Sequence, residues 1–234
     1  MMGNNIVHSK GRTMRSFRFN HLWGTFVFIF LLVSVSAALQ GAPIRVKPQV
    51  AAGGTHTVGL KSDGTAVAVG ANNEWQCEVN RFASWKDITQ IDAGGSHTVA
   101  LRSDGTVVAI GYAPACATGT WRNIIQVSAG DETTVGLQSD GSVINAPFNE
   151  IILTGIIQVS AGSGHTVGLR PDGTVAAVGR NYSGQCNVES LTGIIQVSAG
   201  GFHTVALKYD GTVEAVGENY YGQCDVTSLS LIHI

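Results

Sequence analysis

Residues 161–179 read AGSGHTVGLRPDGTVAAVG, two alternating runs of apolar and polar residues around the dipeptide Asp-Gly. Alternation with a period of two is typical of strands that have one buried face. Asp-Gly between two such runs is a strong short-range signal for a β-hairpin. We therefore predict an antiparallel hairpin with a tight type I′ turn at Asp172 and Gly173.

This hairpin sequence occurs five times along the chain. An Ala-Gly step opens each copy, and the Asp-Gly turn follows eleven positions later. Successive copies are 41, 36, 32 and 38 residues apart, and the differences in length all lie after the turn. The steps begin at Ala52, Ala93, Ala129, Ala161 and Ala199, and the turns are Asp63-Gly64, Asp104-Gly105, Asp140-Gly141, Asp172-Gly173 and Asp210-Gly211.

Each copy has the length of one blade of a β-propeller. An apolar strand such as IIQVSAG leads in, HTVAL and TVEAVG flank the turn, and QCDV is a weaker fourth strand. Four strands every ~40 residues is typical of blades, which stack because one sheet cannot bury both faces alone. We predict an all-β propeller of four-stranded blades with no helix in the repeats. The predicted blades are residues 49–89, 90–125, 126–157, 158–195 and 196–234.

The pattern AG..HTV.L..DGTV.AVG.N..GQC.V resembles the repeat of the regulator of chromosome condensation family over residues 49–229. The resemblance implies a seven-bladed propeller, so five repeats indicate a truncated ring, with a closed five-bladed ring as the alternative. The short units are similar to those of secreted bacterial members, such as a propeller-type β-lactamase inhibitor. Two places depart from the pattern. The third repeat reads AGDETTV, with Thr133 in place of His and no Gly-Gln-Cys, and SLIHI after Leu229 replaces the expected TGIIQ, which indicates an interrupted end.

The N-terminus has the organisation of a secretory signal. Lys10, Arg12, Arg15 and Arg18 precede an apolar run at residues 22–39, which small residues close. We predict a cleaved signal peptide at residues 1–38 and a linker at 39–48, hence a secreted or cell-surface protein. The alternative is an uncleaved membrane anchor through residues 22–39.

Charge excludes one class of function. From residue 39 onward there are 10 Lys and Arg against 16 Asp and Glu, a net charge of −6. A nucleic-acid-binding protein needs a basic surface. We therefore expect no nucleic-acid partner.

No group of residues in the repeats indicates catalysis, and we predict a protein that is not an enzyme and has no cofactor. The repeated His residues, His56, His97, His165 and His203, are interpreted as structural and not as metal ligands, because equivalent positions on separate blades seldom converge on one ion. The Cys after Gln76, Gln185 and Gln223 is interpreted as a small buried side chain and not as half of a disulfide.

The connections between strands are where we expect binding. The first and third connections of an antiparallel blade emerge at one end, and the Asp-Gly turns emerge at the other. Aromatic side chains on a rigid frame are favoured anchors for protein partners and for sugars. The candidate binding residues are Trp75, Tyr112, Asp131, Glu132, Tyr182, Phe202, Tyr220 and Tyr221.

These features favour a non-catalytic scaffold that binds an extracellular or surface protein. Two alternatives are an inhibitor of an extracellular enzyme, which the resemblance implies, and a glycan-binding propeller, which the aromatics imply. The resemblance also implies guanine-nucleotide exchange on a GTPase. The predicted signal peptide disfavours that activity, because export separates the protein from cytosolic GTPases.

Overall fold

The computed structural model describes residues 45–81 and 85–229 of the 234-residue chain. The chain divides into two units, Met1–Gly41 and Ala42–Ile234, and the described residues belong to the second. The predicted signal peptide, the apolar run at residues 22–39 and the SLIHI ending lie outside the described residues. Within those residues, no helix has the length and apolar character needed to cross a membrane.

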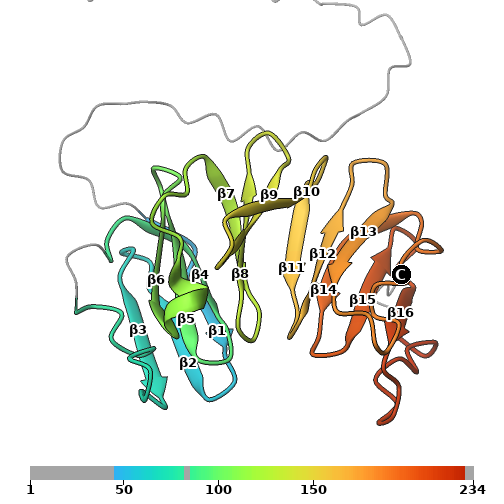
Figure 1. Cartoon of the computed structure of the whole chain (residues 1–234), viewed down its shortest axis with the longest axis horizontal. Helices are drawn as coiled ribbons and strands as arrows, with labels where there is room; N and C mark the ends of the chain where they lie inside the picture. The colour runs from blue at the N-terminus through green and yellow to red at the C-terminus, as the bar shows by residue number, and fades with distance from the viewer. Residues whose placement is uncertain (1–44, 82–84, 230–234) are drawn as a thin grey trace, which may run out of the picture. The chain divides into compact units, whose positions relative to one another are not determined.

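The described residues form five antiparallel sheets, and each sheet contains strands that are consecutive in the chain (Figure 1). The first sheet has β1 (Gln49–Ala52), β2 (His56–Leu60) and β3 (Ala66–Gly70), and the second has β4 (Ile88–Ala93), β5 (His97–Arg102) and β6 (Val107–Gly111). The third has β7 (Ile124–Ala129), β8 (Thr134–Gln138), β9 (Val143–Ala146) and β10 (Glu150–Leu153). The fourth has β11 (Gln158–Ala161), β12 (His165–Leu169) and β13 (Val175–Gly179), and the fifth has β14 (Ile194–Ala199), β15 (His203–Lys208) and β16 (Val213–Gly217).

The all-β prediction is confirmed, and the sheets have the strand order of propeller blades. A short 3₁₀ helix, η1 (Ala113–Cys116), follows β6, although the sequence predicted no helix in the repeats. We call the first strand of each sheet, β1, β4, β7, β11 or β14, its inner strand. Three of these inner strands, β4, β7 and β14, begin two residues before the predicted starts of their repeats, at Ile88, Ile124 and Ile194.

The Asp-Gly turns are three-residue loops, so the predicted type I′ turn is wrong. In the first sheet the amide of Gly64 donates to the carbonyl of Lys61 at 3.0 Å, and the amide of Lys61 donates to the carbonyl of Thr65 at 2.8 Å. Gly64 has a φ of 79°, whereas Asp63 is not among the residues with positive φ. This is a type I turn followed by a left-handed glycine. Asp63 favours it, because its Oδ1 accepts bonds from the amide and the hydroxyl of Thr65, at 2.9 and 2.6 Å.

The fourth strand is present in the third sheet, as β10, and the other four sheets have three strands each in the described residues. Elsewhere the segment predicted as a fourth strand folds into turns that side chains hold together. In the fourth repeat, Asn181 Oδ1 accepts the amide of Cys186 at 2.8 Å, and the Cys186 thiol donates to the carbonyl of Arg180 at 3.4 Å. These bonds satisfy backbone groups that a fourth strand would otherwise pair. The third repeat lacks Gly-Gln-Cys and forms β10 in its place.

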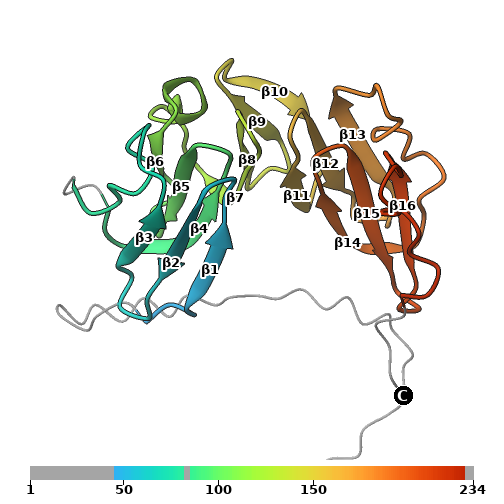
Figure 2. The ribbon, with the colours of Figure 1, turned by 90° about the horizontal axis from the view of Figure 1, so that it is seen from below.

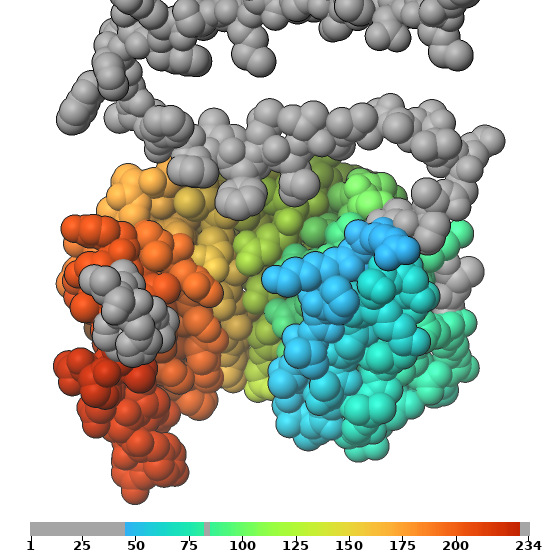
Figure 3. Space-filling model, turned by 180° about the vertical axis from the view of Figure 1, so that it is seen from behind, coloured from blue at the N-terminus to red at the C-terminus, as the bar shows by residue number. Residues whose placement is uncertain are grey.

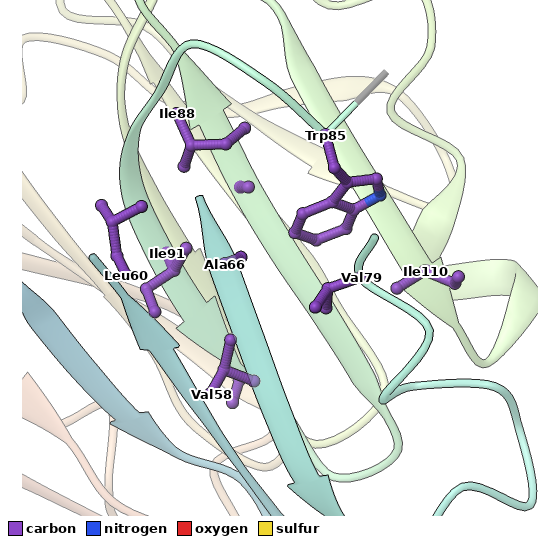
Figure 4. Packing of buried hydrophobic residues seen from close by; sticks show 10 residues of the cluster. Val58, Leu60, Ala66, Val79, Trp85, Ile88, Ile91 and Ile110 are labelled. Carbon is purple, nitrogen blue, oxygen red and sulfur yellow. The ribbon is translucent and has the colours of Figure 1, made fainter. Parts of the chain in front are cut away.

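The hydrophobic core lies between neighbouring sheets, not within any one of them. Val58 and Leu60 of the first sheet pack with Ile88 and Ile91 of the second, and Trp85 from the connecting segment joins them (Figure 4). Three further clusters lie between the second and third, third and fourth, and fourth and fifth sheets, which follow one another in chain order (Figure 2). Because each core requires two sheets, the repetition of the sequence is what stabilises the fold.

Candidate functional site

The Ala-Gly steps bring the inner strands of the five sheets together around one hollow. At each of the first four steps the glycine lies against the backbone carbonyl of the equivalent glycine in the next repeat. A Cβ added there would approach that oxygen more closely than 3.0 Å, which real Cβ atoms do not do. The steps and their neighbours line a hollow of about 320 Å³. Figure 3 shows the surface hollowed between the first sheet (blue) and the fifth sheet (orange). Close packing between neighbouring sheets therefore requires this glycine in the first four repeats.

A glutamine on each of the first four inner strands bonds to the inner strand that follows. Gln90 Nε2 donates to the carbonyl of Val127 at 3.0 Å, and Gln90 Oε1 accepts the amide of Val127, also at 3.0 Å. Gln126 makes the same two bonds to Val159, at 2.9 and 3.0 Å. Gln49 and Gln158 occupy the same register positions on β1 and β11 and bond to β4 and β14. These amides fix the spacing between neighbouring sheets.

Three of the four repeated histidines, His56, His97 and His165, also join their sheets to a neighbouring sheet. Each Nε2 lies within hydrogen-bond distance of a threonine hydroxyl, and each hydroxyl also lies 2.8 Å from a backbone carbonyl to which it donates. A hydroxyl has one proton, so it must accept its second bond from Nε2–H, and the imidazole is the neutral Nε2–H tautomer. The pairs are His56–Thr98 at 2.9 Å, His97–Thr134 at 3.0 Å and His165–Thr204 at 3.0 Å.

The environment of these histidines keeps them neutral at pH 7. The Nδ1 atoms of His56, His97 and His165 are buried, and none has a hydrogen-bond partner in the described part of the chain. Burial, with a smaller contribution from His56, lowers the pKa of His97 to about 4. Burial also lowers the pKa values of His56 and His165. The hydrogen bonds of these three histidines are therefore contacts between sheets. Residues 45–81 and 85–229 contain no group of three or more His, Cys, Asp or Glu positioned to hold a metal ion.

The four cysteines are free thiols, and those of Cys77, Cys186 and Cys224 donate to backbone carbonyls. Cys77 Sγ donates to the carbonyl of Ala71 at 3.2 Å, and Cys224 Sγ donates to that of Glu218 at 3.3 Å. Burial raises the pKa of each thiol, and it raises the pKa of Cys116 to about 12. These groups therefore stay protonated near neutral pH and are poor nucleophiles.

Backbone hydrogen bonds place the first and third connections of a sheet at the same end. The residue after the third strand donates its amide to the carbonyl of the residue before the second strand. The pairs are Ala71 to Thr55, Tyr112 to Ser96, Arg180 to Gly164 and Glu218 to Phe202, at 3.0, 2.9, 2.8 and 2.9 Å. We call this end, formed by the first and third connections, the connection face. The Asp-Gly turns lie at the other end of the strands.

The candidate aromatic residues lie on the connection face and are mostly exposed. The exposed fractions are 93% for Tyr182, 82% for Tyr220, 85% for Tyr221, 55% for Trp75 and 45% for Phe202. Tyr220 and Tyr221 meet edge to face, with ring centroids 4.7 Å apart. The side chains belong to connections of the first, fourth and fifth sheets, so the structure places them at one end but distributes them over several blades.

The other three candidate residues differ from one another in exposure. Asp131 and Glu132 are exposed on the first connection of the third sheet, where Ser163 Oγ donates to Asp131 Oδ2 at 3.2 Å. Tyr112 is half-buried between β6 and η1. Two residues that sequence reasoning did not select are Arg81, whose guanidinium lies 4.3 Å from the Trp75 ring centroid, and Tyr209, which is exposed beside an Asp-Gly turn. The sequence could have placed Tyr209 at the exposed Asp-Gly turn, because it directly precedes Asp210. No sequence pattern indicated that Arg81 would contact Trp75.

Comparison with known proteins identifies the family. The family described as Regulator of chromosome condensation (RCC1) repeat matches residues 49–76, 88–112, 156–185 and 194–223. Four of the five repeats of this chain therefore match the RCC1 repeat, and their sheets are blades of the RCC1-type β-propeller fold. The third repeat falls outside the matched ranges, in agreement with its missing His and Gly-Gln-Cys. No curated protein sequence matches the chain.

Solved structures share the fold at low sequence identity. Prp20p from Saccharomyces cerevisiae is similar at 19% identity with a TM-score of 0.59, over 72% of this chain and 56% of that one. The CRINKLY ectodomain of the Arabidopsis thaliana receptor kinase ACR4 is similar at 19% identity with a TM-score of 0.61, over 72% and 70%. Human WBSCR16 is similar at 16% identity with a TM-score of 0.58, over 73% and 62%. The chain therefore spans little more than half the length of Prp20p.

Proposed function

We propose that this chain is a secreted or surface-exposed, non-catalytic scaffold that binds a protein partner through its connection face. The observation that carries the proposal is the set of exposed aromatic rings on that face, held by a frame whose sheets are bonded to one another. Tyr and Trp offer large contact areas at a low cost in conformational entropy, and they are over-represented where binding energy concentrates.

The turns that carry these rings are rigid, which supports the proposal. Gln185 Oε1 accepts the amide of Ser183 at 2.9 Å, and the Gln185 carbonyl accepts the hydroxyl of Thr204 on the next sheet at 2.8 Å. The Gln185 side chain is fully buried. A ring such as Tyr182 is thus presented on a backbone that is already ordered, which lowers the entropic cost of binding.

Similar propellers bind proteins. The Prp20p structure was reported with that protein's binding to Gsp1p and histones, and yeast RCC1 was crystallised with Kap60. At 19–20% identity these partners do not transfer to this chain. They support the coarser proposal that a protein is the partner. The apolar segment at residues 22–39 supports an extracytoplasmic location for that partner.

Site-specific crosslinking tests the proposal. A photoreactive phenylalanine analogue replaces Tyr182 in one protein and Tyr209, which is 75% exposed at the opposite end, in the control. We expect a surface-protein extract to yield a partner crosslinked from position 182 and not from 209. With that partner purified, Tyr182→Ala or Tyr221→Ala should weaken binding about 10-fold or more, while Tyr209→Ala leaves it unchanged. Binding that depends on Tyr209 and not on Tyr182 or Tyr221 would contradict the proposed face.

A further inference from the structure

The turn at residues 72–78 has an unusual residue at a glycine position. The matching turns of the fourth and fifth repeats have Gly184 and Gly222 there, both with a φ of 79°. Trp75 takes the same place with a φ of 69°. The hydrogen-bond scheme is shared, because Asn72 Oδ1 accepts the amide of Cys77 at 2.9 Å, as Asn181 and Asn219 do in their turns. A left-handed conformation disfavours any residue with a Cβ, so the turn by itself does not explain the tryptophan.

The side chain at this position lies at a hollow in the surface. Glu74, Trp75, Arg81, Ile110 and Gly111 line a space of about 350 Å³, within the size range of small-molecule sites. Ile110 belongs to the core between the first and second sheets, which gives the hollow a rigid apolar wall (Figure 4). The Arg81 guanidinium lies 4.3 Å from the ring centroid of Trp75. More than half of the Trp75 side chain remains exposed.

The chemistry of this lining selects among ligand classes. An anion would be attracted by Arg81 and repelled by Glu74. An organic cation on the indole would be repelled by the positive charge of Arg81, whose guanidinium lies 4.3 Å from the ring centroid. A neutral pyranose fits both features, because its C–H face packs on an aromatic ring and its hydroxyls bond to carboxylate and guanidinium groups.

We propose that the hollow beside Trp75 is a carbohydrate-binding site, in which the indole stacks on a pyranose ring and Glu74 and Arg81 bond to its hydroxyls. The strained backbone of Trp75 is explained if the residue is present for binding and not for the stability of the turn. Trp75 also lies on the connection face, but the proposed protein partner is tested through Tyr182 and Tyr221, which are not part of the hollow, so the two proposals can fail separately.

A glycan array of mono- and disaccharides tests the inference, followed by isothermal titration calorimetry with the best pyranoside, a signal that does not depend on Trp75 itself. The variants are Trp75→Gly, which suits the left-handed backbone, Trp75→Asn, which tolerates it, and Glu74→Ala. Tyr209→Ala, an exposed aromatic residue at the opposite end of the strands, is the control. We expect the wild type and the control to bind the same glycans and each site variant to lose at least about 10-fold in affinity.

The melting temperature separates binding from structure. We expect Trp75→Gly to melt at the wild-type temperature or above it, because glycine relieves the strained φ. The proposal is overturned if the wild type binds no glycan on the array, or if binding survives both Trp75 substitutions. It is also overturned if both substitutions lower the melting temperature clearly, or if tetramethylammonium or inorganic phosphate binds the wild type more tightly than any sugar in the same titration.

Discussion

Acidification should destabilise this protein through His97, and His97→Gln should remove that part of the pH dependence. His97 is fully buried, its Nε2–H donates to Thr134, and its Nδ1 has no partner in the described part of the chain. Protonation would place a charged N–H beside Gly94, where Nδ1 now lies. Burial therefore holds the pKa of His97 at about 4, with His56 contributing in the same direction.

The expected loss of stability follows from proton linkage. Between pH 6.5 and about 4 the unfolded chain binds a proton at His97 that the folded chain does not. The contribution of His97 to the free energy of unfolding is therefore complete above pH 6.5 and is lost as the pH falls toward 4. At 1.36 kcal/mol per pH unit, the loss reaches about 3 kcal/mol at the lower limit. His56 and His165, whose pKa values burial also lowers, act in the same direction.

Urea unfolding at about pH 7 and about pH 4.5 measures this effect. His97→Gln keeps a side-chain N–H that can reach Thr134 but cannot take up a proton. We expect the variant to lose about 1–2 kcal/mol at neutral pH. Its further loss on acidification should be about 2–3 kcal/mol smaller than that of the wild type. The carboxylates are the same in both proteins, so their contributions cancel in the comparison. Equal losses in the two proteins would refute the reasoning, because His97 would then be protonated in the folded state or would have an acceptor at Nδ1.

Three further predictions concern contacts between sheets and the thiols. Gly94→Ala should cost about 3 kcal/mol or more in urea unfolding, because its Cβ would meet a carbonyl of the next sheet, whereas Gly119→Ala, with nothing within 4 Å, should change stability by less than about 0.5 kcal/mol. Gln90→Ala should cost about 2 kcal/mol, because it leaves an amide and a carbonyl of β7 unpaired. The equivalent Gln196→Ala on the last sheet, where the side chain is exposed, should be neutral, and equal effects would contradict the role given to the glutamines. Cys116 should resist iodoacetamide at about pH 8 until the protein unfolds, because burial raises its pKa to about 12, and rapid labelling of the folded protein would be inconsistent with this environment.

The sheets themselves could be predicted because their signals are local. A period of two, an Asp-Gly turn and a spacing of about 40 residues are visible in any one repeat or pair of repeats. The turn type was wrong because Asp63 bonds to Thr65 through its side chain and keeps its own φ negative. That choice depends on the residue after the glycine, which the dipeptide rule ignores.

The contacts between sheets could not be predicted, because their partners are far apart in the sequence. His97 and Thr134 are separated by 37 residues, and neither has an unusual neighbour. The missing fourth strands have a similar cause. Asn181 and the Cys186 thiol provide the hydrogen bonds that a fourth strand would have made. Composition alone does not show that side chains will replace the backbone hydrogen bonds between two strands. The candidate aromatic residues could be assigned to a face, because strand order fixes the face, but their distribution over blades depends on the three-dimensional arrangement.

The outward face of the first sheet allows a last prediction. Val50 of β1 is 77% exposed, whereas Val127, at the same register position of β7, is 1% exposed because the second sheet packs on it. In the free chain, Val50→Thr should therefore change the free energy of unfolding by less than about 0.5 kcal/mol. Val127→Thr should cost about 2 kcal/mol, since it buries a hydroxyl among apolar side chains. Urea unfolding of both variants at several protein concentrations makes the comparison. If Val50→Thr costs as much as Val127→Thr, the outward face of the first sheet is covered in solution. A cost that grows with protein concentration would then identify a second copy of the chain as the cover, because the stability of an intermolecular contact depends on concentration and that of an intramolecular contact does not.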